Sequence, residues 1–213
     1  MMTPRRIART ALARGLAGIA IADHGTIQGG LAVRAAAPTE LLVVVGAEIY
    51  TTVGDIVCLF LSQEITGRDP LDVIAQAHEQ GGVAFFPHPL RSHPKQIPTE
   101  VLAACDGYEE LNARAGGFSP TGNPEAASHW GALVGKARLA NSDAHLYSEI
   151  GAAFTSIEGP ATEENIRQAI LLGATYPGGV TVPARNFYKS QLIKAIKTRD
   201  ISMVARFTRR LFR

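Results

Sequence analysis

Short apolar segments alternate with helical segments six times along this 213-residue chain. The alternation is the strongest constraint on the fold, because strands that alternate with helices form a mostly parallel sheet or barrel. Gly54 separates two further segments, 48–52 and 55–61, that resemble a hairpin. The predicted strands are 16–22, 41–45, 83–86, 107–111, 137–140 and 153–157, and the predicted helices are 5–14, 28–36, 70–78, 98–104, 124–133 and 162–172.

Three predicted helices begin with the residues expected at an N-cap. Thr3 precedes Pro4, Asp69 precedes Pro70, and Thr162 begins the last helix of the alternating region. Thr and Asp side chains can accept hydrogen bonds from the first backbone N–H groups, and proline suits the first helical turn. These positions therefore predict where each helix starts.

The composition indicates one globular domain with a short appendage. Hydrophobic residues make up 46% of the chain, yet no segment approaches the roughly 18 apolar residues of a membrane span. The N-terminal residues lack the apolar region of a secretory signal. Cys58 and Cys105 show no paired spacing and indicate no disulfide framework, so a cytoplasmic protein is expected.

The charge is uneven along the chain. From Arg185 onward there are nine Lys or Arg residues and one acidic residue, although the net charge is only +2. We expect residues 1–178 to form the domain and residues 179–213 to form a basic amphipathic helical tail. Its apolar positions either pack on the domain or support binding to an anionic surface, nucleic acid or a partner. The apolar positions at helical spacing are Leu192, Ile193, Ile196, Val204, Phe207 and Leu211, with Asp200 as a candidate cap.

Histidines and carboxylates recur where predicted strands give way to loops. His24 and Glu48 follow the first two apolar runs, His88 follows the third, and Asp143 and His145 follow the strand at 137–140. Loops at the carboxyl ends of parallel strands are where α/β folds place their chemistry. Four such positions together predict a metal site, although each one alone is more often a turn or a cap.

Local spacing supports this interpretation. Asp143 and His145 are two residues apart, so their side chains point the same way in an extended segment. His88 lies between two prolines, which fix the direction of the chain. Asp23 precedes His24 and could accept the second imidazole N–H, as carboxylates often do beside metal-binding histidines.

The motifs Asp23-His24, Gly46-Ala47-Glu48, His88-Pro89 and Ser142-Asp143-Ala144-His145 resemble those of the PHP domain, the polymerase and histidinol phosphatase family. The resemblance covers roughly residues 3–172. It implies a distorted (β/α)7-type barrel holding up to three divalent metal ions, here Zn, Mn or Fe. The metal ligands implied by it are His24, Glu48, His88, Asp143 and His145, with Asn112 or Glu109 as a further ligand.

By the same resemblance, the chain is a metal-dependent phosphoesterase, acting on a phosphorylated small metabolite or a nucleotide through a metal-activated water. Asp23, His24, Glu48, His88, Asp143 and His145 form the expected catalytic set. Arg91, His93 and Arg114 are candidates to hold the substrate phosphate, against the alternative that the two arginines are solvated loop charges.

The chain departs from the family at its start. The family begins with a His-x-His strand, whereas no histidine precedes His24 here. Either an upstream segment supplies that first strand, or the chain is a shortened form that binds metal weakly. A truncated, non-catalytic binding module is therefore an alternative function. A nucleic-acid-associated nuclease is a further alternative function. It is disfavoured because the chain before Arg185 carries more acidic than basic residues.

Overall fold

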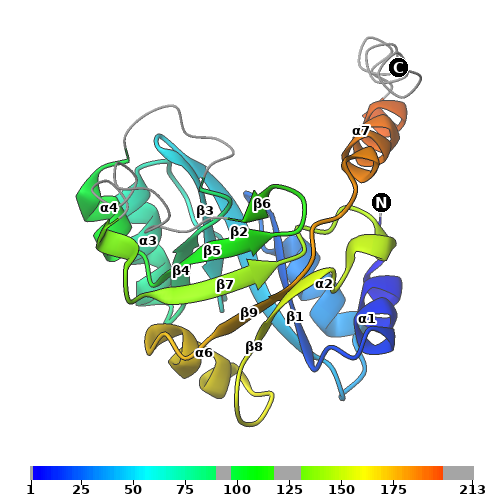
Figure 1. Cartoon of the computed structure of the whole chain (residues 1–213), viewed down its shortest axis with the longest axis horizontal. Coiled ribbons are helices and arrows are strands. Elements are labelled where there is room, and N and C mark those ends of the chain that lie inside the picture. Colours follow the sequence, from blue (N-terminus) through cyan, green and yellow to red (C-terminus); the bar gives the residue numbers. More distant parts are fainter. Residues whose placement is uncertain (1, 90–96, 118–130, 199–213) are drawn as a thin grey trace.

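The computed structural model describes residues 2–89, 97–117 and 131–198. They form a mixed α/β fold around a curled, half-barrel sheet with helices on both faces (Figure 1). The helices are α1 (Pro4–Ala13), α2 (Gln28–Ala36), α3 (Pro70–Glu79), α4 (Thr99–Ala104), α6 (Glu163–Leu171) and α7 (Ala184–Thr198). The strands are β1 (Gly18–His24), β2 (Leu42–Thr51), β3 (Gly54–Leu59), β4 (Val83–Phe86), β5 (Gly107–Asn112), β6 (Gly116–Gly117), β7 (Ala137–Asn141), β8 (Ala153–Ser156) and β9 (Tyr176–Gly179). Short 3-10 helices occupy Gly131–Leu133 (η1) and Tyr147–Glu149 (η2).

The main sheet has the order β1-β2-β3-β4-β5, and both β6 and β7 pair with β5. Three pairs are parallel, namely β1 with β2, β4 with β5, and β5 with β7. The hairpin strand β3 lies between β2 and β4 and is antiparallel to both. The sheet is therefore more mixed than the alternation alone predicts, because the turn at Gly54 returns the chain directly beside β2.

The two faces of β2 show how this sheet is covered. Val45, Ala47 and Ile49 face outward, into the core formed with α3 and α4. Val44 faces the inner, concave side, where it packs with Val57 and with Ile170 of α6. Because side chains alternate along a strand, Glu48 and Tyr50 lie on the same inner face as Val44. The concave face of β2 is therefore apolar at Val44 and polar toward the end of the strand, at Glu48 and Tyr50.

The helices α1 and α2 cover the outer face of β1 and β2 (Figure 1). The predicted caps of two helices are confirmed: Asp69 accepts hydrogen bonds from Leu71 and Asp72, and Thr162 accepts one from Asn165. Thr3 precedes α1 as expected but makes no side-chain cap hydrogen bond. Its backbone N–H instead donates to the Tyr147 hydroxyl at 2.6 Å, which ties α1 to η2.

Two segments differ from the predictions. In 124–133, only Gly131–Leu133 is described, and it forms a 3-10 turn instead of the end of an α-helix. Tyr176–Gly179 forms β9, which pairs with β8 although its Pro and Gly residues disfavour strands. The expected domain boundary after residue 178 falls inside this strand, so the division of the chain at that point stays a prediction.

Helix α7 projects from the body of the molecule (Figure 1). Ser190 and Ala195 are buried, whereas Ile193 and Ile196 are exposed. The second apolar segment of the tail, with Asp200, lies outside the described residues. Within the described part of the chain, no helix has the length and apolar character needed to cross a bilayer.

Candidate metal centre

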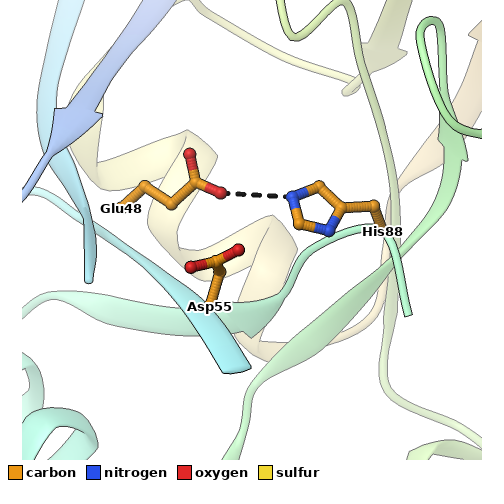
Figure 2. Close-up of side chains that lie close together, drawn as sticks. All are labelled: Glu48, Asp55 and His88. Atoms are coloured by element: carbon orange, nitrogen blue, oxygen red, sulfur yellow. Dashed lines mark hydrogen bonds and ion pairs between the residues drawn. The ribbon is translucent and has the colours of Figure 1, made fainter. Parts of the chain in front are cut away.

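Glu48, Asp55 and His88 point toward one another at the polar end of the concave face (Figure 2). One potential ligand atom from each lies within 4.8 Å of the other two. The Glu48 carboxylate and the His88 Nε2 atom are 3.1 Å apart. Forty residues separate Glu48 from His88 along the chain, and the fold brings them together as the predicted site requires.

The register of the β2–β3 hairpin explains why Asp55 joins this cluster. Tyr50 pairs with Asp55 across the hairpin, and Glu48 pairs with Val57. Paired residues share a face of the sheet, so Asp55 lies diagonally opposite Glu48 on the concave side. Asp55 was not predicted as a site residue from the sequence. The predicted hairpin itself indicated its position, because a residue just after the turn of a hairpin pairs with the end of the preceding strand.

His24 lies beside this cluster. The parallel register pairs His24 of β1 with Glu48 of β2, and the His24 Nδ1 atom is 3.3 Å from a Glu48 oxygen. The imidazole is 74% exposed, so it faces solvent at the rim of the cluster. Asp23 points to the opposite face, as alternation requires. Its carboxylate lies against Gly29 in the first turn of α2, where a Cβ atom would come within 1.6 Å of it. The structure does not bring Asp23 to the His24 ring.

His88 is held in an unfavourable backbone conformation. Its φ is +28°, a region that non-glycine residues rarely occupy. The His88 backbone N–H donates to a Glu109 carboxylate oxygen at 2.6 Å. Asp143, another predicted ligand, has a φ of +46°. Strained backbone of this kind clusters at functional sites, where the surrounding structure holds it in place.

Glu109 is a buried carboxyl directly behind His88. Burial raises the pKa of Glu109 to about 7, although hydrogen bonds from Asn112, the His88 backbone and Asn141 lower it in part. The Asn112 amide donates to Glu109, and its oxygen accepts two backbone N–H groups, those of Arg114 and Ala115. Glu109 and Asn112, the two alternatives for a further ligand, are both buried and lie next to each other. Their roles as ligands stay predictions.

Asp143 and His145 form a second group on the loop after β7. The His145 Nδ1 atom is 3.4 Å from the Asp143 carboxylate and 2.9 Å from the Asp143 carbonyl oxygen. Among the described residues, the only three-residue group of metal-ligand spacing is that of Glu48, Asp55 and His88. Asp143 and His145 do not belong to that group, and their metal-binding role stays a prediction.

Glu149 holds the Asp143–His145 loop in place. Its carboxylate accepts the backbone N–H groups of His145 and Leu146. The same carboxylate pairs with Arg114 through two hydrogen bonds of 3.1 and 3.0 Å. The side chains of Arg114 and Glu149 are 2% and 0% exposed, so this is a buried ion pair. Glu149 was not predicted from the sequence, because its partner Arg114 lies 35 residues away, in the turn after β5.

Arg114 was expected to hold a substrate phosphate. In the structure its guanidinium donates to Glu149 and to the Ser190 hydroxyl of α7, and it lies over the Phe187 ring. This arrangement joins the end of β5 to α7, and phosphate binding by Arg114 stays a prediction. The other two phosphate-binding candidates, Arg91 and His93, lie outside the described residues.

The donors of the cluster suit a divalent cation. Two carboxylates of the same charge repel each other, and a cation between them would compensate both charges. Carboxylate and imidazole ligands together suit Zn, Mn or Fe. Neither Cys58 nor Cys105 belongs to this cluster, and burial raises the pKa of both thiols to about 12. The residues present therefore fit a metal ion at Glu48, Asp55 and His88.

Comparisons with known proteins place this fold among PHP-like proteins. The family model described as PHP-associated matches residues 125–175. An uncharacterized protein of Methanocaldococcus jannaschii is 38% identical over 113 residues, which are 52% of this chain and 66% of that protein.

Two crystal structures have similar folds. One is a two-domain protein from Bacteroides vulgatus containing a predicted PHP-like metal-dependent phosphoesterase, with a TM-score of 0.69 and 19% identity. The match covers 84% of this chain and 61% of that one. The other is a candidate metal-dependent phosphoesterase from Bifidobacterium adolescentis, with a TM-score of 0.51 and 16% identity over 85% and 93% of the two chains. The chain thus matches about two thirds or less of the length of the Methanocaldococcus jannaschii and Bacteroides vulgatus proteins.

Proposed function

We propose that the chain is a metal-dependent phosphoesterase of the PHP-domain family, and its PHP-associated segment and PHP-like fold support this proposal. The proposed substrate is a phosphate ester of a small metabolite or a nucleotide. The observation that supports this proposal most directly is the convergence of Glu48, Asp55 and His88 within 4.8 Å.

In this proposal Glu48, Asp55 and His88 hold the cation, and His24 supplies a further nitrogen at the exposed rim. A bound divalent ion would lower the pKa of a water molecule and polarise a phosphoryl oxygen. Zinc, manganese and iron are the proposed metals. Asp143 and His145 would close the other side of the site, held there by Glu149.

The remaining residues have supporting roles. Glu109 and Asn112 hold the backbone of His88 and of the turn after β5. Arg91, His93 and Arg114 are proposed to contact the substrate phosphate. We also propose a cytoplasmic location, supported by the two free, buried cysteines, and contact between the basic tail and an anionic surface.

The experiment measures metal content and hydrolysis in the same preparations. Purified protein is loaded with Mn²⁺ or Zn²⁺, and hydrolysis of p-nitrophenyl phosphate, nucleoside monophosphates and single-stranded DNA is followed. We expect hydrolysis of the small esters, with a loss of at least about 100-fold in His88→Ala and Asp55→Asn, because each removes a metal ligand. Glu158→Gln is the matched control, because Glu158 is exposed.

Three other outcomes would change the assignment. Full activity in His88→Ala and Asp55→Asn would refute the proposed site. Metal binding without hydrolysis of any ester would favour the non-catalytic binding module. Hydrolysis of DNA in preference to the small esters would favour the nuclease.

A further inference from the structure

An open hollow of about 510 Å³ lies beside the metal centre. His24 and Glu48 are among the residues that line this hollow. A ligand bound in it could therefore contact both a cation held by Glu48 and the rest of the wall of the hollow. The rest of this wall includes Tyr50, Ile65, Gly67 and Arg68.

Tyr50 and Arg68 form a stacked pair on this wall. The Arg68 guanidinium carbon lies 4.6 Å from the centre of the Tyr50 ring. Tyr50 is 62% exposed, so a large ring is left open to solvent next to the proposed catalytic centre. Tyr50 follows Glu48 by two residues on the same face of β2, a separation of about 7 Å along a strand.

The loop that carries Arg68 is fixed in place although it has no regular secondary structure. Gln80 accepts the backbone N–H groups of Ser62 and Gln63, and Gln76 bonds both the N–H and the carbonyl of Thr66. Glu64 accepts hydrogen bonds from Thr26, Ile27 and Gln28 near the start of α2, and the Arg68 carbonyl accepts the Thr52 N–H. A surface loop held at four places is pre-organised, as ligand-binding loops on rigid scaffolds are.

The chemistry of this wall fits a planar ring attached to an anion. Aromatic rings and guanidinium planes are the surfaces on which proteins stack nucleobases. A guanidinium also attracts phosphate oxygens. Ile65 and the two glycines that line the hollow, Gly25 and Gly67, add surface without polar side-chain groups, against which a planar ring can lie.

We propose that the Tyr50–Arg68 pair binds the base of a nucleotide whose phosphate lies at the Glu48–Asp55–His88 centre. This inference rests on the proposed function and makes it more specific: the substrate class is nucleotides, not phosphorylated aliphatic or sugar metabolites. Tyr50 is then a specificity-determining residue, and Arg68 supports its ring and contributes positive charge.

The test compares two esters that differ in the base, adenosine 5′-monophosphate and ribose 5-phosphate, with Mn²⁺-loaded protein. Loss of a stacked base predicts that Tyr50→Ala raises KM for the nucleotide by roughly tenfold more than KM for the sugar phosphate. Tyr50→Phe retains the ring and should behave as the wild type. Tyr176→Ala is the matched control, because Tyr176 is similarly exposed but lies on β9, outside the hollow.

A separate binding measurement distinguishes failure of this inference from failure of the proposed function. Saturation-transfer NMR detects adenosine on the protein without turnover, and we expect a signal in the wild type that is lost in Tyr50→Ala. Equal changes in KM for both esters, or no change for either, would overturn the inference while leaving the phosphoesterase proposal intact. Absence of hydrolysis together with a Tyr50-dependent adenosine signal would refute only the proposed function. A wild type without an adenosine signal would overturn the inference.

Discussion

The His88 side chain reaches Glu48 because its backbone is held in a conformation that costs energy. Its φ of +28° persists because Pro87 and Pro89 restrict the chain on both sides and Glu109 accepts the His88 N–H. The free energy that offsets this strain comes from the surrounding buried structure. Strain at a predicted metal ligand is therefore consistent with a site whose geometry the fold imposes before any ion binds.

Glu109 gives this region a measurable pH dependence. In the unfolded chain its carboxyl loses its proton near the ordinary pKa of 4.5, whereas in the folded protein burial holds the proton up to about pH 7. Between these values the folded state binds more protons, so the contribution of Glu109 to the free energy of unfolding falls as pH rises. Above about pH 7 both states are ionised and the contribution is constant.

We therefore expect Glu109→Gln to remove part of the pH dependence of stability between about pH 4.5 and pH 7. Urea unfolding of the metal-free protein in EDTA measures this, with exposed Glu158→Gln as the control that keeps the wild-type slope. Identical slopes for the wild type and Glu109→Gln would show that Glu109 is not held protonated by burial.

The β2–β3 hairpin is the element on which the proposed cation site depends. It places Glu48 and Asp55 on one face, and Gly46 allows β3 to approach β2 closely. A Cβ at Gly46 would lie 2.5 Å from the Cys58 carbonyl oxygen and 2.6 Å from a Leu59 methyl carbon. The first contact is with backbone, which cannot move aside without shifting the strand.

We expect Gly46→Ala to lower the free energy of unfolding by roughly 1–3 kcal/mol and to weaken Mn²⁺ binding, because β3 must shift relative to Glu48. Chemical denaturation and calorimetric titration with Mn²⁺ measure the two effects. Gly131→Ala is the matched control, because no atom of the described residues lies within 4 Å of its Cβ position. Unchanged stability and Mn²⁺ affinity in Gly46→Ala would contradict this account of the hairpin.

A buried ion pair links the strand end at β5 to η2. Removing one partner of such a pair leaves an uncompensated buried charge, which costs about 3–5 kcal/mol. We expect that loss in Glu149→Ala, together with weaker order of the Asp143–His145 loop, visible as faster amide hydrogen exchange at His145 and Leu146. In Glu110→Ala, which breaks the more exposed pair with Arg138, we expect a loss of less than about 1 kcal/mol. Similar losses in the free energy of unfolding for Glu149→Ala and Glu110→Ala would show that the buried pair stabilises the fold no more than the exposed pair.

Across the whole molecule, hydrogen bonds connect the two groups of predicted ligands. The connection runs from His88, in the cluster of Glu48, Asp55 and His88, to His145 in the loop after β7. Its members, in order, are His88, Glu109, Asn112, Arg114, Glu149 and His145. The half-barrel thus positions both groups through one continuous set of polar contacts.

The sequence predicts most of the elements and only part of this arrangement. Runs such as 41–45 and 83–86 are identifiable because they are apolar and short, and Asp69 and Thr162 are identifiable as caps because capping is local. Asp55 and Glu149 were not identified, because their partners depend on strand register and on contacts between distant segments. β9 was missed because pairing with β8 overrides the poor strand propensity of its Pro and Gly residues.

The proposed function depends on a divalent cation held by Glu48, Asp55 and His88. The most direct measurement is anomalous X-ray diffraction from crystals soaked in Mn²⁺. We expect a manganese peak between the carboxylates of Glu48 and Asp55 and the Nε2 atom of His88, with the peak lost in Asp55→Asn crystals. A difference map with no manganese at these three side chains, or with manganese only at other positions, would contradict it.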